Sequence, residues 1–113
     1  MKSIITEDLR HCILSGCPDP CIHHVFGASN RRRSDEDGLV VPLDPKLHNE
    51  GGKPEPGVRC DMHHCRNMRL LMEMVGQLCW EREYIAKRRD LPFDDIEDAA
   101  RQAFRERYGK SVL

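Results

Sequence analysis

The chain has 113 residues, enough for one domain with a modest core, and only six of them are aromatic. A formal net charge of -1 excludes the uniformly basic composition of a non-specific nucleic-acid binder, although arginines gather locally at residues 31–33. No apolar run approaches the roughly 18 residues that span a bilayer, and the first residues do not resemble a secretory signal. We therefore expect a cytoplasmic protein with no membrane partner, in which cysteines are free thiols or metal ligands rather than disulfides.

The first 60 residues predict two short strands and two loops. Residues 22–26 and 38–41 are each predicted to form a short strand, and the second is expected to stop at Pro42, because proline cannot donate to a strand ladder. The polar residues 27–37 between them are predicted to be a loop. Residues 42–60, rich in proline and glycine, are predicted to be a second, longer loop.

Two helices are predicted after residue 65. The first is expected to run to about Arg89 and to be closed by Leu91-Pro92, and the second to begin at an Asp94 N-cap paired with Glu97 and to end at Gly109. Apolar residues recur at three- and four-residue steps, so each helix has one face predicted to pack in the core or against another helix. The methionine-rich face of the first helix is also compatible with a homodimer. These faces comprise Met68, Leu71, Met72, Val75, Leu78 and Cys79 in the first helix, and Ile96, Ala99, Ala100, Ala103 and Phe104 in the second.

Five of the six histidines form two adjacent pairs and one loop position: His23, His24, His48, His63 and His64. Side chains alternate along a strand, so one histidine of the first pair can bind a metal while its neighbour faces a substrate. Neutral imidazole is the commonest metal ligand near neutral pH, and three converging imidazoles leave open positions on the ion for water and phosphate. Spacing alone leaves this interpretation and that of unrelated surface histidines equally open.

Residues 12–16, 22–31 and 38–49 and the tail 108–113 together resemble a known family. The segment Ile22-His-His-Val-Phe-Gly27 is the most specific part. The chain is similar, over nearly its whole length, to HNH (ββα-metal, treble-clef) nucleases of bacteriophages and prophages, including phage recombination-enhancement nucleases. The resemblance implies one α+β domain over residues 1–113. A β-hairpin HNH core within residues 1–65 would bind the metal, and residues 66–113 would form two helices.

The resemblance also implies an activity and its residues. The chain would be an endonuclease of the bacterial host cytoplasm that hydrolyses DNA phosphodiester bonds with one divalent ion, Zn²⁺, Mg²⁺ or Mn²⁺. His24 would be the general base on a water molecule, and Asn30 would orient the base or a phosphate. The metal ligands would be His23, His48 and His63, with His64 as the competitor for the third position. The phosphate contacts would come from Arg31, Arg32 and Arg33.

Departures from the family pattern leave alternatives open. Two Cys-x-x-Cys knuckles hold a structural zinc in many such proteins, but they read Cys12-Ile-Leu-Ser15 and Asp44-Pro-Lys-Leu47 here. We expect that zinc to be absent and to be replaced by packing of apolar neighbours. An alternative zinc site would use Cys17, Cys21, Cys60 and Cys65. The apolar neighbours of the lost knuckles are Ile13, Leu14, Leu43 and Leu47.

The second alternative concerns activity. Leu47 stands where the family often has a further histidine, which weakens the expectation of catalysis. The chain would then be an HNH-fold binding protein that acts on DNA, or on a host or phage protein, without cutting.

Overall fold

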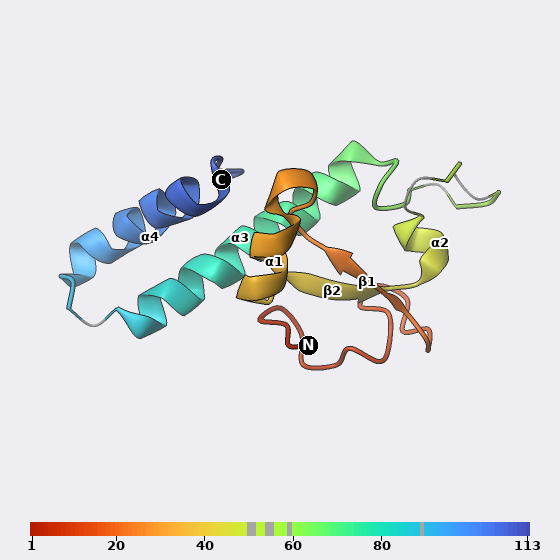
Figure 1. Ribbon diagram of the computed structural model, residues 1–113, viewed down its shortest axis with the longest axis horizontal. Coiled ribbons are helices and arrows are strands. Elements are labelled where there is room, and N and C mark those ends of the chain that lie inside the picture. Colours follow the sequence, from red (N-terminus) through yellow and green to blue (C-terminus); the bar gives the residue numbers. More distant parts are fainter. Residues whose placement is uncertain (50–51, 54–55, 59, 89) are drawn as a thin grey trace.

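The computed structural model describes residues 1–49, 52–53, 56–58, 60–88 and 90–113. As predicted, the architecture is α+β, with a two-stranded hairpin and two C-terminal helices (Figure 1). The hairpin lies beside the first part of α3 (Arg66–Lys87), and α4 (Phe93–Tyr108) folds back along the remainder of that helix. The molecule is therefore elongated, with extents of 51 × 24 × 21 Å.

The sheet pairs β1 (Cys21–His24) with β2 (Val40–Leu43) in antiparallel register, so that Ile22 lies opposite Pro42. The prediction that the second strand stops at Pro42 is wrong. The carbonyl of Pro42 accepts a hydrogen bond from the Ile13 amide at 2.9 Å, so this edge of the residue faces away from β1. A missing N–H at this position removes no bond between the strands, and proline is tolerated.

The connection between the strands is helical, which corrects the predicted loop at residues 27–37. A 3-10 turn, η1 (Ala28–Asn30), leads into α1 (Arg31–Asp37). Ser34 is fully buried in this helix, and its hydroxyl accepts the Phe26 amide at 2.9 Å. Gly38 ends the helix at φ +74, where an added Cβ would lie 3.0 Å from the Lys2 carbonyl. Tertiary contacts thus stabilise α1, a short helix that its polar sequence does not predict.

A second short helix, α2 (Pro45–His48), lies within the predicted loop 42–60 and corrects part of it. Asp44 is its N-cap and accepts the Lys46 amide at 3.0 Å, while Pro45 takes the first helical position. Residues 50–51, 54–55 and 59 of the predicted loop lie outside the described residues. The helix places His48 at its last position.

The long helices confirm the predicted elements but not all of their ends. The first ends at Lys87, close to the expected Arg89, which lies outside the described residues. The second begins at Phe93 after Pro92 as N-cap, so the prediction of Asp94 as N-cap is wrong: proline, at φ -56 and ψ 145, leads the chain directly into the helix. Gly109 ends α4 in the left-handed conformation, as predicted.

The predicted core face of α3 is wrong in part. Of the six residues assigned to it, Met72 is buried, whereas Leu71, Val75 and Leu78 are 58%, 39% and 53% exposed. The helix is rotated because Gly76 approaches the hairpin, where an added Cβ would lie 2.8 Å from Cγ1 of Val25. The apolar stripe predicted for α4 is confirmed at its three buried residues, Ile96, Ala100 and Phe104.

One core joins the hairpin to both long helices. The buried apolar cluster consists of Cys12, Val25, Phe26, Leu39, Val41, Leu43, Met62, Met72, Phe104 and Tyr108.

Within the described part of the chain, no helix is both long and apolar enough to cross a membrane.

Candidate metal centre

Three histidines from three separate parts of the chain meet beside β1. His23 lies on β1, His48 is the last residue of α2, and His63 lies in the turn that precedes α3. The ring centroid of His23 lies 5.1 Å from that of His48 and 5.3 Å from that of His63. The centroids of His48 and His63 are 4.7 Å apart. One nitrogen from each ring lies within 4.8 Å of the others, so the group could hold a metal ion.

His23 is the most enclosed member of this cluster. The residue is 3% exposed, and its Nε2 is buried with no hydrogen-bond partner in the described chain. Burial, together with smaller contributions from the neighbouring His48 and His63, lowers the pKa of His23 from 6.5 to about 3. The ring is therefore neutral near pH 7, and its lone pair is available to a cation. A buried polar atom without a partner is costly, and a bound ion would remove that cost.

The other two imidazoles face each other through their Nε2 atoms, 3.1 Å apart. On the far side of the His48 ring, Nδ1 lies 3.1 Å from the sulfur of Cys21. Without an ion, one of these nitrogens can carry the proton and donate a hydrogen bond to the other. In the tautomers that leave both nitrogens unprotonated, both lone pairs are available to a cation. The donor set thus fits a metal ion.

The turn that carries His63 is anchored at several points. Asp61 is buried and accepts hydrogen bonds from the amide and the Nδ1 of His64, at 2.8 and 2.7 Å, and from Asn49 at 3.1 Å. The Met62 amide donates to the Leu47 carbonyl at 2.6 Å, which attaches the turn to α2. Of the two adjacent histidines, His63 therefore joins the cluster and His64 turns to Asp61.

Cys60 and Cys65 form a disulfide across this turn. The expectation that the cysteines are not in disulfides is wrong for this pair. The alternative zinc site with four cysteines is wrong for the same reason, because a disulfide sulfur is not a thiolate ligand. Cys17 is exposed on the surface. The turn brings the two cysteines together, with their Cα atoms 5.2 Å apart.

His24 follows His23 on the strand and lies at the edge of the same pocket, a cavity of about 300 Å³ that also contains Arg31. Its Nε2 lies 3.3 Å from Oδ1 of Asp35 on α1. If this nitrogen carries the proton and donates to the carboxylate, then Nδ1 is the basic nitrogen. His24 thus lies next to the three-histidine cluster but is not one of its members.

The three arginines have different surroundings. Arg31 lines the histidine pocket and, within the described residues, makes no ion pair. Arg32 pairs with Glu36 at 3.0 Å and lines a neighbouring hollow beside His24. Arg33 donates to the Ser29 carbonyl and to the Asn30 side chain. Of the three arginines, Arg31 is the one that lines the histidine pocket.

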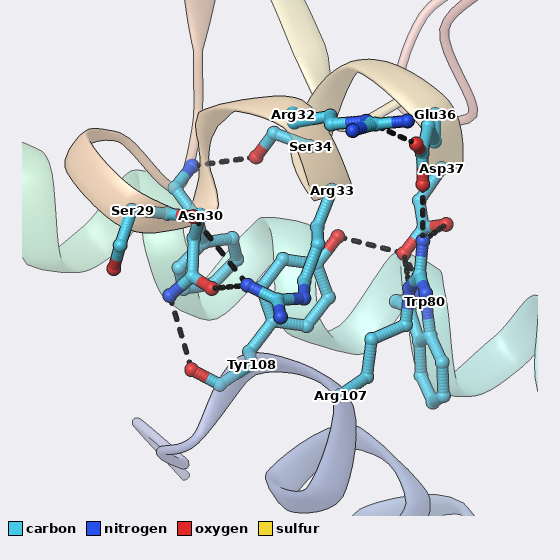
Figure 2. A network of polar contacts seen from close by, with 11 residues as sticks. Ser29, Asn30, Arg32, Arg33, Ser34, Glu36, Asp37, Trp80, Arg107 and Tyr108 are labelled. Carbon is cyan, nitrogen blue, oxygen red and sulfur yellow. Dashed lines mark hydrogen bonds and ion pairs between the residues drawn. The ribbon is translucent and has the colours of Figure 1, made fainter.

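Asn30 points toward α4. Its Nδ2 donates to the Tyr108 carbonyl at 3.0 Å, and its Oδ1 accepts from Arg33 at 3.2 Å (Figure 2). These contacts do not support the expected role of Asn30 in orienting the base or a phosphate. They make Asn30 a structural link between η1 and the end of α4.

The residues at and beside the positions of the family's zinc knuckles differ in burial. Cys12 and Leu43 are buried in the core and Leu47 packs against it, but Ile13 and Leu14 are 37% and 48% exposed. The expected packing role of Ile13 and Leu14 is therefore wrong. The Ile13 amide is used instead to bind the carbonyl of Pro42.

Sequence reasoning missed two residues that contact the predicted site, Asp35 and Asp61, and it named Cys21 only as a ligand of the alternative zinc site. A signal existed for Cys21, because residues two apart on a strand face the same side, and this cysteine precedes His23 by two. The other two are brought in from α1 and from the turn before α3 by long-range folding, for which no local pattern exists.

Comparison with known proteins gives no further assignment: no family model, no curated protein and no solved structure matches the chain.

Proposed function

We propose that this chain is a metal-dependent phosphodiesterase of the HNH type that cleaves DNA. One observation carries the proposal: three imidazoles from separate elements converge, and one of them presents a buried nitrogen without a hydrogen-bond partner in the described chain. The hairpin that carries His23 and His24 would be the HNH core. The resemblance of residues 22–27 and of the tail, residues 108–113, to HNH nucleases supports the same assignment.

The metal ligands in this proposal are His23, His48 and His63. Three nitrogen donors are typical of Zn²⁺, whereas Mg²⁺ prefers oxygen ligands, so the donor set favours Zn²⁺. When bound, the ion supplies positive charge for the phosphate and for the departing oxygen.

His24 would act as the general base. With Nε2 donating to Asp35, the Nδ1 of His24 accepts the proton of the attacking water. Arg31, on the wall of the same pocket, would bind a phosphate oxygen of the DNA backbone and hold the strand over the histidines. Backbone contacts of this kind carry no sequence preference by themselves.

The first test is cleavage by the His24→Ala variant, with supercoiled plasmid and Zn²⁺, Mn²⁺ or Mg²⁺. We expect nicking to fall by about 10²- to 10⁴-fold, the usual contribution of a general base. Metal content and the circular dichroism spectrum should be unchanged, because His24 is outside the cluster. The matched control is His11→Ala, since His11 is an exposed histidine that contacts Asp8. Wild-type protein that nicks no DNA with any of these ions would overturn the proposal.

A second candidate is a binding protein on the same scaffold that does not cut. The exposed apolar residues Leu71, Val75 and Leu78 favour it, because three such residues on one helix face are more common at protein contacts than on a free surface. Such a protein would bind Zn²⁺ normally and would be inert in the nicking assay.

A further inference from the structure

The thiol of Cys21 lies behind the metal cluster, in contact with one of its rings. Its sulfur is 3.1 Å from Nδ1 of His48 and 3.3 Å from the carbonyl oxygen of Leu43. The geometry allows the thiol hydrogen to point to the Leu43 oxygen, with the sulfur accepting a hydrogen bond from the Nδ1–H of His48. Cys21 then occupies the place that a carboxylate or a backbone carbonyl commonly takes behind a metal-binding histidine.

We propose that Cys21 is the positioning residue for His48 in the metal centre, an inference that rests on the proposed function. A proton on Nδ1 leaves the Nε2 lone pair to point into the cluster, where it faces the Nε2 of His63 at 3.1 Å. Cys21 therefore selects the tautomer that binds metal and sets the plane of the ring.

His48 needs such support more than the other two ligands. It is the last residue of α2, a helix of four residues, and the next residue, Asn49, leaves the helix in the left-handed conformation at φ +42. A ring on so short an element has little backbone structure to orient it. His23, by contrast, is held in the sheet, and the turn of His63 is held by Asp61 and by a disulfide.

The sulfur lies on the Nδ1 side of the ring, opposite the nitrogen that faces His63. Among the described residues, the ligand atoms close enough to share one ion are nitrogens of the three imidazoles. Cys21 thus acts through His48 and not as a fourth ligand.

The test compares Zn²⁺ affinity in three variants by competition with a chromogenic chelator. We expect Cys21→Ala to weaken Zn²⁺ binding by about 10- to 100-fold, the usual effect of removing such a partner. Cys21→Ser should stay within a few-fold of wild type, because a hydroxyl can also donate to Leu43 and accept from His48. Cys17→Ala, which removes an exposed cysteine four residues earlier, should leave the affinity unchanged. Wild-type affinity in Cys21→Ala would overturn the proposal.

A second measurement uses wild-type protein and tests the proposal even if the alanine variant fails to fold. In metal-free wild-type protein, at a pH where imidazoles are neutral, the ring ¹⁵N shifts of His48 should report the Nδ1–H tautomer. The Nε2–H tautomer as the main form would overturn the role of Cys21. Wild-type protein that binds no Zn²⁺, with the Nδ1–H tautomer intact, would instead overturn the metal centre of the proposed function and leave the contact between Cys21 and His48 standing.

Discussion

At the scale of single residues, His23 combines burial, neutrality and a nitrogen without a protein partner. Burial, and to a smaller extent the neighbouring imidazoles, lowers its pKa to about 3. An unfolded histidine titrates near 6.5. The same burial that makes the ring a good ligand at neutral pH therefore makes the fold sensitive to acid.

We expect the stability of the metal-free protein to fall as the pH is lowered from 6.5 toward 3. In that window the unfolded chain binds a proton at residue 23 and the folded chain does not, so acid favours unfolding, by up to about 1.4 kcal/mol per pH unit. Urea denaturation at about pH 7 and about pH 5 measures the change. The His23→Gln variant should lose this part of the pH dependence. Equal slopes in the two proteins would contradict the assignment.

At the scale of elements, α1 is attached to both long helices through its last residue. Asp37 accepts hydrogen bonds from Trp80 of α3 and from Arg107 and Tyr108 of α4 (Figure 2). Burial raises the pKa of Tyr108, and its bond to Asp37 raises it further. Because α1 also carries Arg31 and Asp35, this network holds one wall of the histidine pocket against the helices.

We expect Asp37→Ala to lower the free energy of unfolding by about 2–4 kcal/mol, because the buried Tyr108 hydroxyl and the Arg107 guanidinium lose their shared acceptor. Glu36→Ala is the matched control on the same helix. Glu36 is half exposed, and its pairs with Arg32 and Arg107 should contribute less than about 1 kcal/mol. Chemical denaturation of the two variants measures both values, and equal losses would contradict the central role of Asp37.

At the scale of the whole molecule, the histidine cluster joins the two parts of the chain. His23 and His48 belong to the hairpin part, and His63 belongs to the turn that begins α3. The disulfide between Cys60 and Cys65 closes this turn into a small ring, with His63 inside it. His63, the proposed third ligand, is thus restrained without an ion, which would lower the entropy lost when an ion binds.

We expect the double variant Cys60→Ser, Cys65→Ser to lose about 2 kcal/mol of stability, the chain-entropy contribution of so short a closed loop. Its Zn²⁺ affinity should also fall, because His63 must then be ordered by the ion itself. Thermal unfolding and a Zn²⁺ competition titration measure the two effects, with Cys17→Ser as the control. Unchanged Zn²⁺ affinity would show that Asp61 and the backbone bond to Leu47 are sufficient to hold the turn.

Much of the fold follows from local patterns in the sequence. The three- and four-residue spacing predicts both long helices, and Gly109 ends the second because glycine adopts the left-handed conformation readily. The apolar runs predict the hairpin to within two residues. Residue type marks five histidines as candidate ligands, and the resemblance to HNH nucleases selects among them His23, His48 and His63, the three that meet in the cluster.

Tertiary structure decided the rest. Contacts distant in the chain make residues 31–37 a helix, turn Leu71, Val75 and Leu78 outward, and join Cys60 to Cys65. They also direct Asn30 to α4, place Cys21 behind His48, and separate His63 from His64. Spacing along a chain determines which side chains share a face of one element. Which face is buried, and which residues from different elements meet, depends on how those elements pack against one another.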